Sequence, residues 1–493
     1  MGNVTKVLVA NRGEIAVRII GTLRKLGVPS VAVHHAIDAK SLAVREADEA
    51  VELFGTPPVA AYLDIAAIVE ACQRSGADAV HPGFGFLSEK ANFAEALATA
   101  GITFIGPRPH AMRAMGDKIA SKRVAQKAGV STIPGHAGEV ESAEHAVKIA
   151  REIGYPVMIK ASAGGGGKGM RLAFDDGECR EGFARATGEA QASFGDARLF
   201  IERCIERPHH IEIQVLGDAH GNIVHLGERE CSIQRRHQKV IEEAPSPFVD
   251  AKTRHAMGAQ AVALARAVDY QSAGTVEFIV DPQRNFYFLE MNTRLQVEHP
   301  VTELTTGLDI VAEQIRIARG EPLGYDQDDM RLSGHAIECR LYAEDADAGF
   351  LPATGRLHLL RLPHGEGIRV DHDLREGQDV SAVFDPMLAK IAAHGADRAQ
   401  AIARLREALR ETVALGTVTN ADYLERVLAH PCFASGETHT GFLSEHVEAL
   451  RALPPDAEQL TVLLGAAALT HRQFDARFIC PEPLGAMGEW RNR

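Results

Sequence analysis

The first 115 residues alternate short apolar β-like runs with segments in which apolar residues recur at helical spacing. The β-like runs are residues 6–10, 30–35, 78–82 and 102–106, and the helical patterns cover residues 14–26, 63–74 and 88–100. This alternation predicts a parallel sheet covered by helices. The first strand-to-helix turn, residues 10–14, carries one glycine. It therefore lacks the GxGxxG dinucleotide motif, and we do not expect NAD to bind.

Residues 81–89, HPGFGFLSE, follow a predicted strand and open a helix that Ser88 could cap. Ligands of open α/β sheets bind beyond the carboxyl ends of the strands. The loop is therefore either a wall of a binding site or a connection shaped by its glycines, and the sequence leaves both interpretations open.

The clearest period of two lies in residues 286–303, FYFLEMNTRLQVEHPVTE. As an extended strand, this segment has one largely apolar face and one face rich in acids, amides and an arginine. The second face contains Phe286, Phe288, Glu290, Asn292, Arg294, Gln296 and Glu298. Residues 275–280 predict a partner strand, and residues 281–285 predict the turn of a hairpin.

A four-residue loop in this hairpin would place Glu277 directly opposite Glu290. Because like charges that face each other across two strands repel, the pair predicts a bound cation. Oxygen ligands from Glu277, Glu290 and Asn292 suit Mg²⁺ or Mn²⁺ completed by phosphate oxygens.

Four consecutive glycines, Gly164, Gly165, Gly166 and Gly167, lie between two β-like runs and precede Lys168. Exposed backbone amides in such a loop can surround phosphate oxygens. Lys168 is followed by glycine rather than by serine or threonine, so the loop is not a Walker A motif. We favour a phosphate-covering flap over a passive turn, since long glycine loops in compact domains are usually functional.

A basic group, Arg235, Arg236, His237 and Lys239, stands between acidic pairs in residues 227–245. A run of charges is usually a solvated face. Here the run connects two β-like segments, which favours a loop that contacts phosphate and a small oxyanion.

The chain has 493 residues, of which 45% are hydrophobic and 24% charged, as is typical of a globular protein with several domains. A net charge of −13 argues against a nucleic-acid surface, and no apolar run approaches the ~20 residues that span a membrane. The seven cysteines follow no metal-ligand spacing, which predicts reduced and mostly buried thiols. With no charged leader at the start, we expect a cytoplasmic protein.

Together these motifs resemble the biotin carboxylase family, the ATP-grasp component of biotin-dependent carboxylases. The matching stretches occur in family order from Val7 to Glu445: VANRGEIAVRI, HPGFGFLSE, MGDK, KASAGGGGKGM, HIEIQ, RECSIQRRHQK, EMNTRLQVEHPVTE and GHAIECRLYAED. Several of them are especially similar to α subunits of propionyl-CoA carboxylases.

The resemblance implies an α/β fold with three domains and a tail. Residues 1–115 would form a Rossmann-like (pre-ATP-grasp) N-terminal domain, and residues 116–331 an ATP-grasp core with a mobile glycine-rich lid at 133–205. Residues 332–446 would form a C-terminal α+β domain. The tail, residues 447–493, resembles the start of a linker to a partner-binding region.

The resemblance also implies a reaction in which ATP phosphorylates bicarbonate to carboxyphosphate, and the CO₂ released from it carboxylates biotin. Residues matched to ATP contacts are Lys118, Lys160, the glycines 164–167, Glu202, Cys204, Ile205, His210, Gln234 and His237. The metal ligands would be Glu277, Glu290 and Asn292, in agreement with the hairpin argument.

Bicarbonate would be held by Lys239, Arg294, Gln296 and the Val297 amide. Glu298 would remove its proton, and Arg340 would stabilise the biotin enolate. Phe350 could flank biotin, although a phenylalanine before Leu-Pro is more often part of the core. The sequence departs from the family pattern at Phe84, Arg203 and His209, where tyrosine, lysine and arginine are usual.

The biotin attachment motif Ala-Met-Lys-Met is absent from the sequence. We therefore expect biotin on a carrier domain or protein elsewhere, and a carboxyltransferase (β) subunit as a second partner. A homodimer or larger assembly is expected from the family. Propionyl-CoA is the favoured acyl substrate of the whole enzyme. The alternatives are an acetyl-CoA, methylcrotonyl-CoA or pyruvate carboxylase, or a different ATP-grasp carboxylate ligase.

Overall fold

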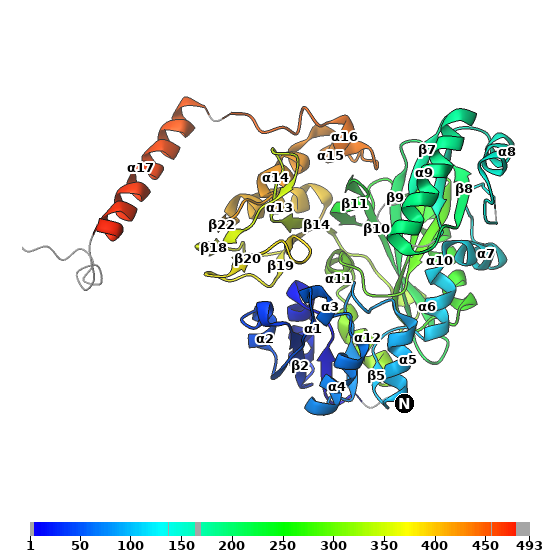
Figure 1. Cartoon of the computed structure of the whole chain (residues 1–493), viewed down its shortest axis with the longest axis horizontal. Helices are drawn as coiled ribbons and strands as arrows, with labels where there is room; N and C mark the ends of the chain where they lie inside the picture. Colours follow the sequence, from blue (N-terminus) through cyan, green and yellow to red (C-terminus); the bar gives the residue numbers. More distant parts are fainter. Residues whose placement is uncertain (1–3, 137, 163–168, 455, 480–493) are drawn as a thin grey trace, which may run out of the picture. The chain divides into compact units, whose positions relative to one another are not determined.

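The computed structural model describes residues 4–136, 138–162, 169–454 and 456–479. Contacts divide the chain into two compact units, Met1–Leu450 and Arg451–Arg493. In the second unit the described residues include helix α17 (Ala457–Ile479), drawn in red-orange in Figure 1. Within the described residues, no helix has the length and hydropathy that crossing a bilayer requires.

The N-terminal part of the first unit is a parallel sheet of five strands, as the alternating pattern predicted. Its strand order is β3 (Glu49–Glu52), β2 (Ser30–His34), β1 (Val7–Val9), β4 (Ala79–His81), β5 (Thr103–Phe104). The expected helices are α1 (Gly13–Lys25), α4 (Ile65–Ser75) and α5 (Ala91–Thr99). Strand β3 was not predicted, because it is a mostly exposed edge strand with one buried residue. The expected Ser88 cap is wrong, since Lys90 precedes α5.

An antiparallel sheet of eight strands forms the centre of the first unit (Figure 1). Its order is β13 (Phe286–Asn292), β12 (Ser272–Val280), β9 (His209–Gly217), β10 (Ile223–Arg235), β11 (Gln238–Ala244), β14 (His335–Tyr342), β21 (Met387–Gly395), β19 (Ile368–His372). Helices α10 (Ala251–Ala267), α11 (His299–Thr306) and α13 (Arg398–Glu411) pack against it. Because β11 pairs with β14, the sheet continues from the expected ATP-grasp region into the expected C-terminal domain.

The expected lid contains a separate sheet in the order β7 (Met170–Ala173), β6 (Val157–Ala161), β8 (Leu199–Arg203). Helices α8 (Ala143–Ile153) and α9 (Asp176–Phe194) pack against it and share its core. The predicted glycine flap, Gly164 to Gly167 with Lys168, lies outside the described residues.

The remaining elements of the first unit are mostly short connections. The helices are α2 (Leu42–Glu46), α3 (Pro58–Ala61), α6 (Pro109–Gly116), α7 (Lys118–Lys127), α12 (Ile310–Ala318), α14 (Ala421–Ala429), α15 (Pro431–Ser435) and α16 (Phe442–Glu445), with 3₁₀ turns at Ala36–Asp38 and Gln327–Asp329. The strands are β15 (Glu344–Asp345), β16 (Leu351–Pro352), β17 (Gly355–Arg356), β18 (Leu359–Arg361), β20 (Asp379–Val380) and β22 (Val413–Leu415).

The predicted hairpin is formed by β12 and β13, and its register pairs Glu277 with Glu290 as expected. The register shifts between Glu277 and Phe278, which leaves Leu289 as a β-bulge. Because the bulge interrupts the period of two, Phe288 packs in the core while Leu289 lines a cavity beside Glu290. The predicted faces are therefore wrong for these two residues.

Two predicted boundaries also differ from the structure. Strand β13 ends at Asn292, so Arg294 and Gln296 lie in a loop and Glu298 is the residue before helix α11. The basic group was expected on a loop, but Arg235 ends strand β10 and Lys239 lies within β11. Only Arg236 and His237 form the turn between them, both with positive φ.

Candidate active site

A cavity of about 260 Å³ lies between the small lid sheet and the central sheet. It is lined by the described residues that the resemblance assigns to ATP, namely Lys118, Lys160, Glu202, Cys204, Ile205, His210, Gln234 and His237. Met158, Phe200 and Leu289 add apolar surface, while Glu277 and Glu290 add carboxylates. A cavity of this kind suits a nucleotide, because the apolar surface can contact the base and the charged groups can contact the phosphates.

Glu202 is the acidic residue of the lid side of the cavity, and it is almost fully buried. Both Lys122 and Lys160 donate to its two carboxylate oxygens. Burial alone would raise the pKa of Glu202, but these two ammonium groups lower it below the ordinary value. The carboxylate is therefore ionised and holds Lys160 in the cavity wall.

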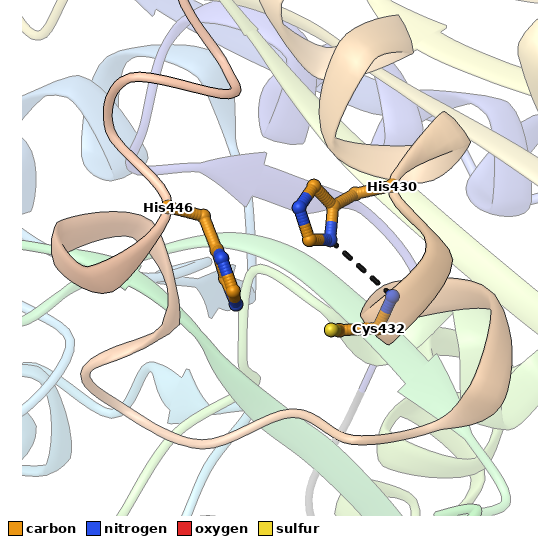
Figure 2. A group of neighbouring side chains, drawn as sticks. All are labelled: His430, Cys432 and His446. Atoms are coloured by element: carbon orange, nitrogen blue, oxygen red, sulfur yellow. Dashed lines mark hydrogen bonds between the residues drawn. The ribbon is translucent and has the colours of Figure 1, made fainter.

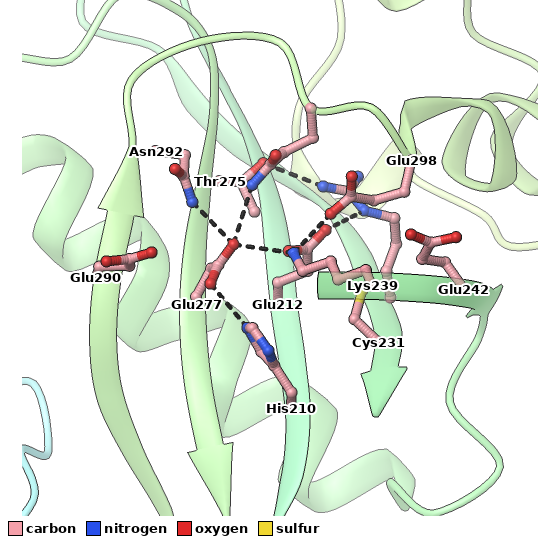
Figure 3. A network of polar contacts seen from close by, with 12 residues as sticks. His210, Glu212, Cys231, Lys239, Glu242, Thr275, Glu277, Glu290, Asn292 and Glu298 are labelled. Atoms are coloured by element: carbon pink, nitrogen blue, oxygen red, sulfur yellow. Dashed lines mark hydrogen bonds and ion pairs between the residues drawn. The ribbon is translucent and has the colours of Figure 1, made fainter. Parts of the chain in front are cut away.

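Glu277 is the residue on which the polar contacts of the central sheet converge (Figure 3). Its Oε2 lies 2.7 Å from His210 Nε2. Its Oε1 accepts from Lys239 at 2.9 Å, from Asn292 at 2.8 Å and from Gln296 at 3.0 Å. Burial raises the pKa of Glu277, but Lys239 and His210 outweigh it and hold that pKa well below its usual range.

Lys239 contacts both Glu277, which lines this cavity, and a second group of buried acids. Its Nζ donates to Glu212 at 2.5 Å, to Glu277 at 2.9 Å and to Glu298 at 2.6 Å. All three side chains are 5% exposed or less, so three buried carboxylates share this one ammonium group. Although burial lowers the pKa of Lys239, the carboxylates raise it well above its usual value.

Glu298 is held between Lys239 and Arg340. Arg340 donates to Glu298 at 3.0 Å and to Glu242 at 2.6 Å. Burial raises the pKa of Glu298, yet Lys239 and Arg340 together bring it below the ordinary value. Glu298 is thus an ionised carboxylate placed between two cationic donors.

Arg294 lies on the loop that follows β13, next to these groups. It donates to Gln296 Oε1 at 2.7 Å and to Asn292 Oδ1 at 3.1 Å. Its Nε donates to Glu89 at 3.0 Å, and Glu89 also accepts from the Thr293 backbone at 3.2 Å. Glu89 is the last residue of HPGFGFLSE, so this loop does reach the site, in line with the binding-wall interpretation.

Three buried residues of the site were missed from the sequence: Glu212, Arg229 and Glu242. Arg229 is fully buried and donates to Glu212 at 2.5 Å. Burial raises the pKa of Glu212 to about 7, partly offset by Arg229. Glu212 alternates with Ile211 and Ile213 in the sequence, a pattern that indicated a solvated face, but both faces of β9 are buried.

The predicted metal ligands were tested against these contacts. Glu277 and Glu290 lie opposite each other and line the same cavity, as a bridging cation requires. However, Lys118 Nζ lies 3.0 Å from Glu290, and Lys239 and His210 contact Glu277. Protein cations therefore already reduce the repulsion between Glu277 and Glu290. The two carboxylates can lie close together without a metal, contrary to the argument made from the sequence. The oxygen donors fit Mg²⁺ or Mn²⁺.

Phe350 and the three departures from the family pattern occupy different environments. Phe350 packs against the C-terminal core, 4.0 Å from the Arg235 guanidinium and 5.1 Å from the Tyr423 ring. This favours the core interpretation of Phe350. Arg203 lines the cavity between the two sheets, His209 stacks on Phe248, and Phe84 is half-buried in the N-terminal core.

The described cysteines are free thiols. Cys231 and Cys339 lie beside site residues and are fully buried, and burial raises the pKa of each thiol well above its ordinary value. The prediction of buried thiols is confirmed for these two residues. Cys204 and Cys432 are half-buried.

Comparisons with known proteins agree with this geometry. Three family models match: the biotin carboxylase N-terminal domain over residues 3–112, the carbamoyl-phosphate synthase L chain ATP-binding domain over 117–325, and the biotin carboxylase C-terminal domain over 338–445. A biotin carboxylase of Halalkalibacterium halodurans is 52% identical over 90% of this chain and 98% of its own length. The chain belongs to the biotin carboxylase family.

Two further relatives of this biotin carboxylase chain carry more specific names. The human mitochondrial propionyl-CoA carboxylase α chain is 58% identical over 89% of this chain, which spans only 61% of that relative's length. The biotin carboxylase domain dimer of a 2-oxoglutarate carboxylase from Hydrogenobacter thermophilus was solved with MgADP, ADP and bicarbonate. It has a TM-score of 0.89 and 45% identity, and the match covers 91% of this chain and 99% of that one. The expected α/β fold with biotin carboxylase N-terminal, ATP-grasp and C-terminal domains is therefore confirmed.

Proposed function

We propose that the chain catalyses the ATP- and bicarbonate-dependent carboxylation of biotin carried on another domain or protein. The observation that carries the proposal is Lys239, whose single ammonium group contacts Glu277 on the nucleotide side and Glu298 on the other side. A nucleotide site and a site for a small oxyanion thus share one wall. This is the arrangement needed to transfer a phosphoryl group from ATP to bicarbonate.

The residues divide the work by their chemistry. Lys118, Lys160, His210 and His237 are the donors of the cavity for phosphate oxygens. Glu277 and Glu290, with Asn292 beside them, would hold Mg²⁺ or Mn²⁺, which neutralises phosphate charge when bound. The glycines 164–167 would cover the phosphates, and Glu202, Cys204 and Ile205 would contact the base.

Bicarbonate would be held by Lys239, Arg294, Gln296 and the Val297 amide, whose donors match a small planar oxyanion. Glu298 would accept its proton. Bicarbonate bound to Lys239 would compete with Glu298 for that ammonium group. The carboxylate would then lose part of the stabilisation that lowers its pKa, and it would become a better base when the substrate is present. Arg340 would place its guanidinium next to this base, where charge develops on biotin.

The domain division given above, at residues 115, 331 and 446, is part of the proposal. The relatives named propionyl-CoA carboxylase α chain support a role as the biotin carboxylase component of an acyl-CoA carboxylase that uses propionyl-CoA. A carboxyltransferase subunit and a biotin carrier would then be the partners. The Hydrogenobacter domain is named a dimer, which supports a homodimer or larger assembly. The cytoplasmic location stays a prediction, because the human relative is mitochondrial.

The direct experiment measures ADP formation by the purified chain with free biotin. We expect ADP formation to require both bicarbonate and biotin, and to match the amount of carboxybiotin formed. ADP formation that needs a different carboxylate in place of bicarbonate would support the ATP-grasp ligase alternative. The acyl-CoA is tested separately, by purifying the partner subunit with this chain and comparing propionyl-CoA with acetyl-CoA and methylcrotonyl-CoA.

A further inference from the structure

Two histidines and a cysteine meet outside the active site, where helices α14, α15 and α16 come together (Figure 2). His430 connects α14 to α15, Cys432 lies in the first turn of α15, and His446 follows α16. One possible ligand atom from each side chain lies within 4.8 Å of the other two. All three residues are half-buried, so the group is held by the fold and is still reached by solvent.

The positions of the two rings are fixed by packing. The centroids of His430 and His446 are 4.2 Å apart, and the Phe442 ring packs on both, at 5.4 Å and 4.7 Å. The only hydrogen bond drawn within the group is long, from the Cys432 backbone N–H to His430 Nδ1 at 3.3 Å.

We propose that His430, Cys432 and His446 bind one zinc ion, with water as the fourth ligand. A thiolate and two imidazoles form a borderline-soft ligand set that suits Zn²⁺, unlike the oxygen donors of Glu277 and Glu290, which suit Mg²⁺ or Mn²⁺. Zinc lies about 2.0–2.3 Å from nitrogen and sulfur ligands. Ligand atoms already within 4.8 Å of one another can therefore reach one ion by small side-chain rotations.

The position of the site gives the metal a consequence for the nucleotide cavity. The chain between Cys432 and His446 contains Thr440, which lines that cavity. The Thr440 backbone N–H donates to the Pro208 carbonyl at 2.9 Å, and the neighbouring His439 lies 3.0 Å from Arg207. A bound zinc would link Cys432 to His446, the two ends of this segment, and so restrict the motion of Thr440. This consequence, unlike the metal site itself, depends on the proposed ATP-binding function.

The metal site is tested with Co²⁺ added to the full chain after chelator treatment, in the absence of nucleotide. We expect one equivalent of Co²⁺ to give a sulfur-to-cobalt charge-transfer band in the near ultraviolet, and one equivalent of Zn²⁺ to abolish it. Cys432→Ser should remove the band, and His446→Gln should weaken Co²⁺ binding by at least about tenfold, since a lost ligand costs no less than a lost second-sphere contact. His364→Gln, at an exposed histidine elsewhere in the C-terminal domain, is the matched control and should bind as the native chain does.

Absence of the band in the native chain, or its persistence in Cys432→Ser, would overturn the proposal. A second group that could bind cobalt is Glu212, Cys231 and Glu298, which is buried. If Cys231→Ser loses the band and Cys432→Ser keeps it, the metal binds at that second group and the proposal is wrong. The melting temperature of each variant shows whether it folds. His446→Gln, at a half-buried position, keeps the test valid if Cys432→Ser does not fold.

Calorimetry of MgADP binding with and without zinc then tests the consequence for the cavity. The MgADP affinity of the native chain should change with zinc, whereas that of Cys432→Ser should not. An unchanged affinity in the native chain would contradict the coupling to Thr440 and leave the cobalt result standing. Failure to bind MgADP at all would instead contradict the proposed function.

Discussion

Two buried lysines, Lys239 and Lys390, each lie among several acids, but the acids around them are in different states. Lys239 donates to three carboxylates at 2.5–2.9 Å. Lys390 is 1% exposed, lies 3.3 Å from Glu14 and 3.6 Å from Asp371, and donates to the Val297 carbonyl at 2.8 Å. Lys390 thus connects α1 and β19 to the turn that carries Glu298.

Two of the acids near Lys239, Glu277 and Glu298, are stabilised as ions, whereas two acids near Lys390 are not. Glu212 is the exception beside Lys239, because its pKa is raised to about 7. At Glu277 and Glu298, nearby cationic donors outweigh the rise in pKa that burial causes, so the pKa of each carboxyl is lowered. Among the described residues, the buried carboxylate oxygens of Glu14 and Glu338 accept no hydrogen bond. Burial raises the pKa of Glu14 to about 7 and that of Glu338 well above its ordinary value. We infer that the first cluster keeps charge available for a substrate, while the second is mainly structural.

Glu298→Gln should give the largest effect on activity. An amide cannot accept the bicarbonate proton, so bicarbonate- and biotin-dependent ADP formation should fall by at least about 100-fold, as for other general bases. Glu14→Gln is the matched change in the second cluster and should keep most of the activity. Equal activity of Glu298→Gln and the native chain would show that Glu298 is not the base.

Replacing each lysine with methionine compares the two clusters by stability. Lys239→Met leaves Glu277 and Glu298, whose pKa values are lowered, buried without their shared cation, and loss of one partner of a buried ion pair costs about 3–5 kcal/mol. Lys390→Met should cost less, because Glu14 and Glu338 can take up protons. The melting temperatures at pH 7 should therefore follow the order native, Lys390→Met, Lys239→Met. The reverse order for the two variants would contradict the assignment of charge states.

The stability of the native chain should depend on pH through Glu14. Its pKa is raised from 4.5 to about 7 in the folded chain, so its contribution is fully present below about pH 4.5 and is lost as the pH rises through 7. The loss would be up to about 3 kcal/mol if the whole shift applies. Glu14→Gln cannot lose a proton, so its melting temperature should rise relative to that of the native chain between pH 5 and pH 8. If the difference between the two melting temperatures stays constant from pH 5 to pH 8, Glu14 is ionised beside Lys390 throughout this range.

Phe350→Leu should give the smallest effect and would show whether this residue belongs to the active site. Its contacts with Arg235 and Tyr423 predict a loss of about 1 kcal/mol from the aromatic interactions. If these are its only role, the KM for biotin should stay the same while the melting temperature falls slightly. A raised KM for biotin with an unchanged melting temperature would favour the biotin contact expected from the family.

The sequence allowed some parts of this site to be predicted and not others, for physical reasons. Local patterns were sufficient for the parallel N-terminal sheet. They also gave the pairing of Glu277 with Glu290, but the four-residue loop behind that prediction is wrong. Val280 pairs with Phe286, so residues 281–285 form the loop, and the bulge at Leu289 brings Glu277 opposite Glu290. Local patterns failed at Leu289, because a β-bulge depends on packing on both sides of the strand. They also failed from Thr293 to Glu298, because the strand ends at Asn292 and a loop leads to helix α11.

Glu212, Arg229 and Glu242 could not be identified for a different reason. Each looks like a solvated charged residue in the sequence, and only the tertiary structure shows that it is buried. His430 and His446 are likewise brought together only by the packing of helices. Residues that matter because of long-range burial leave little local signal in a single sequence.

The most direct measurement follows the oxygen atoms of bicarbonate. The chain would be incubated with ATP, Mg²⁺, free biotin and bicarbonate labelled with ¹⁸O, and the inorganic phosphate analysed by mass spectrometry. If phosphate is transferred to bicarbonate held beside Lys239 and Glu298, each phosphate should carry one ¹⁸O from bicarbonate. Phosphate that takes its oxygen from water instead would show that ATP is simply hydrolysed, and would contradict the account.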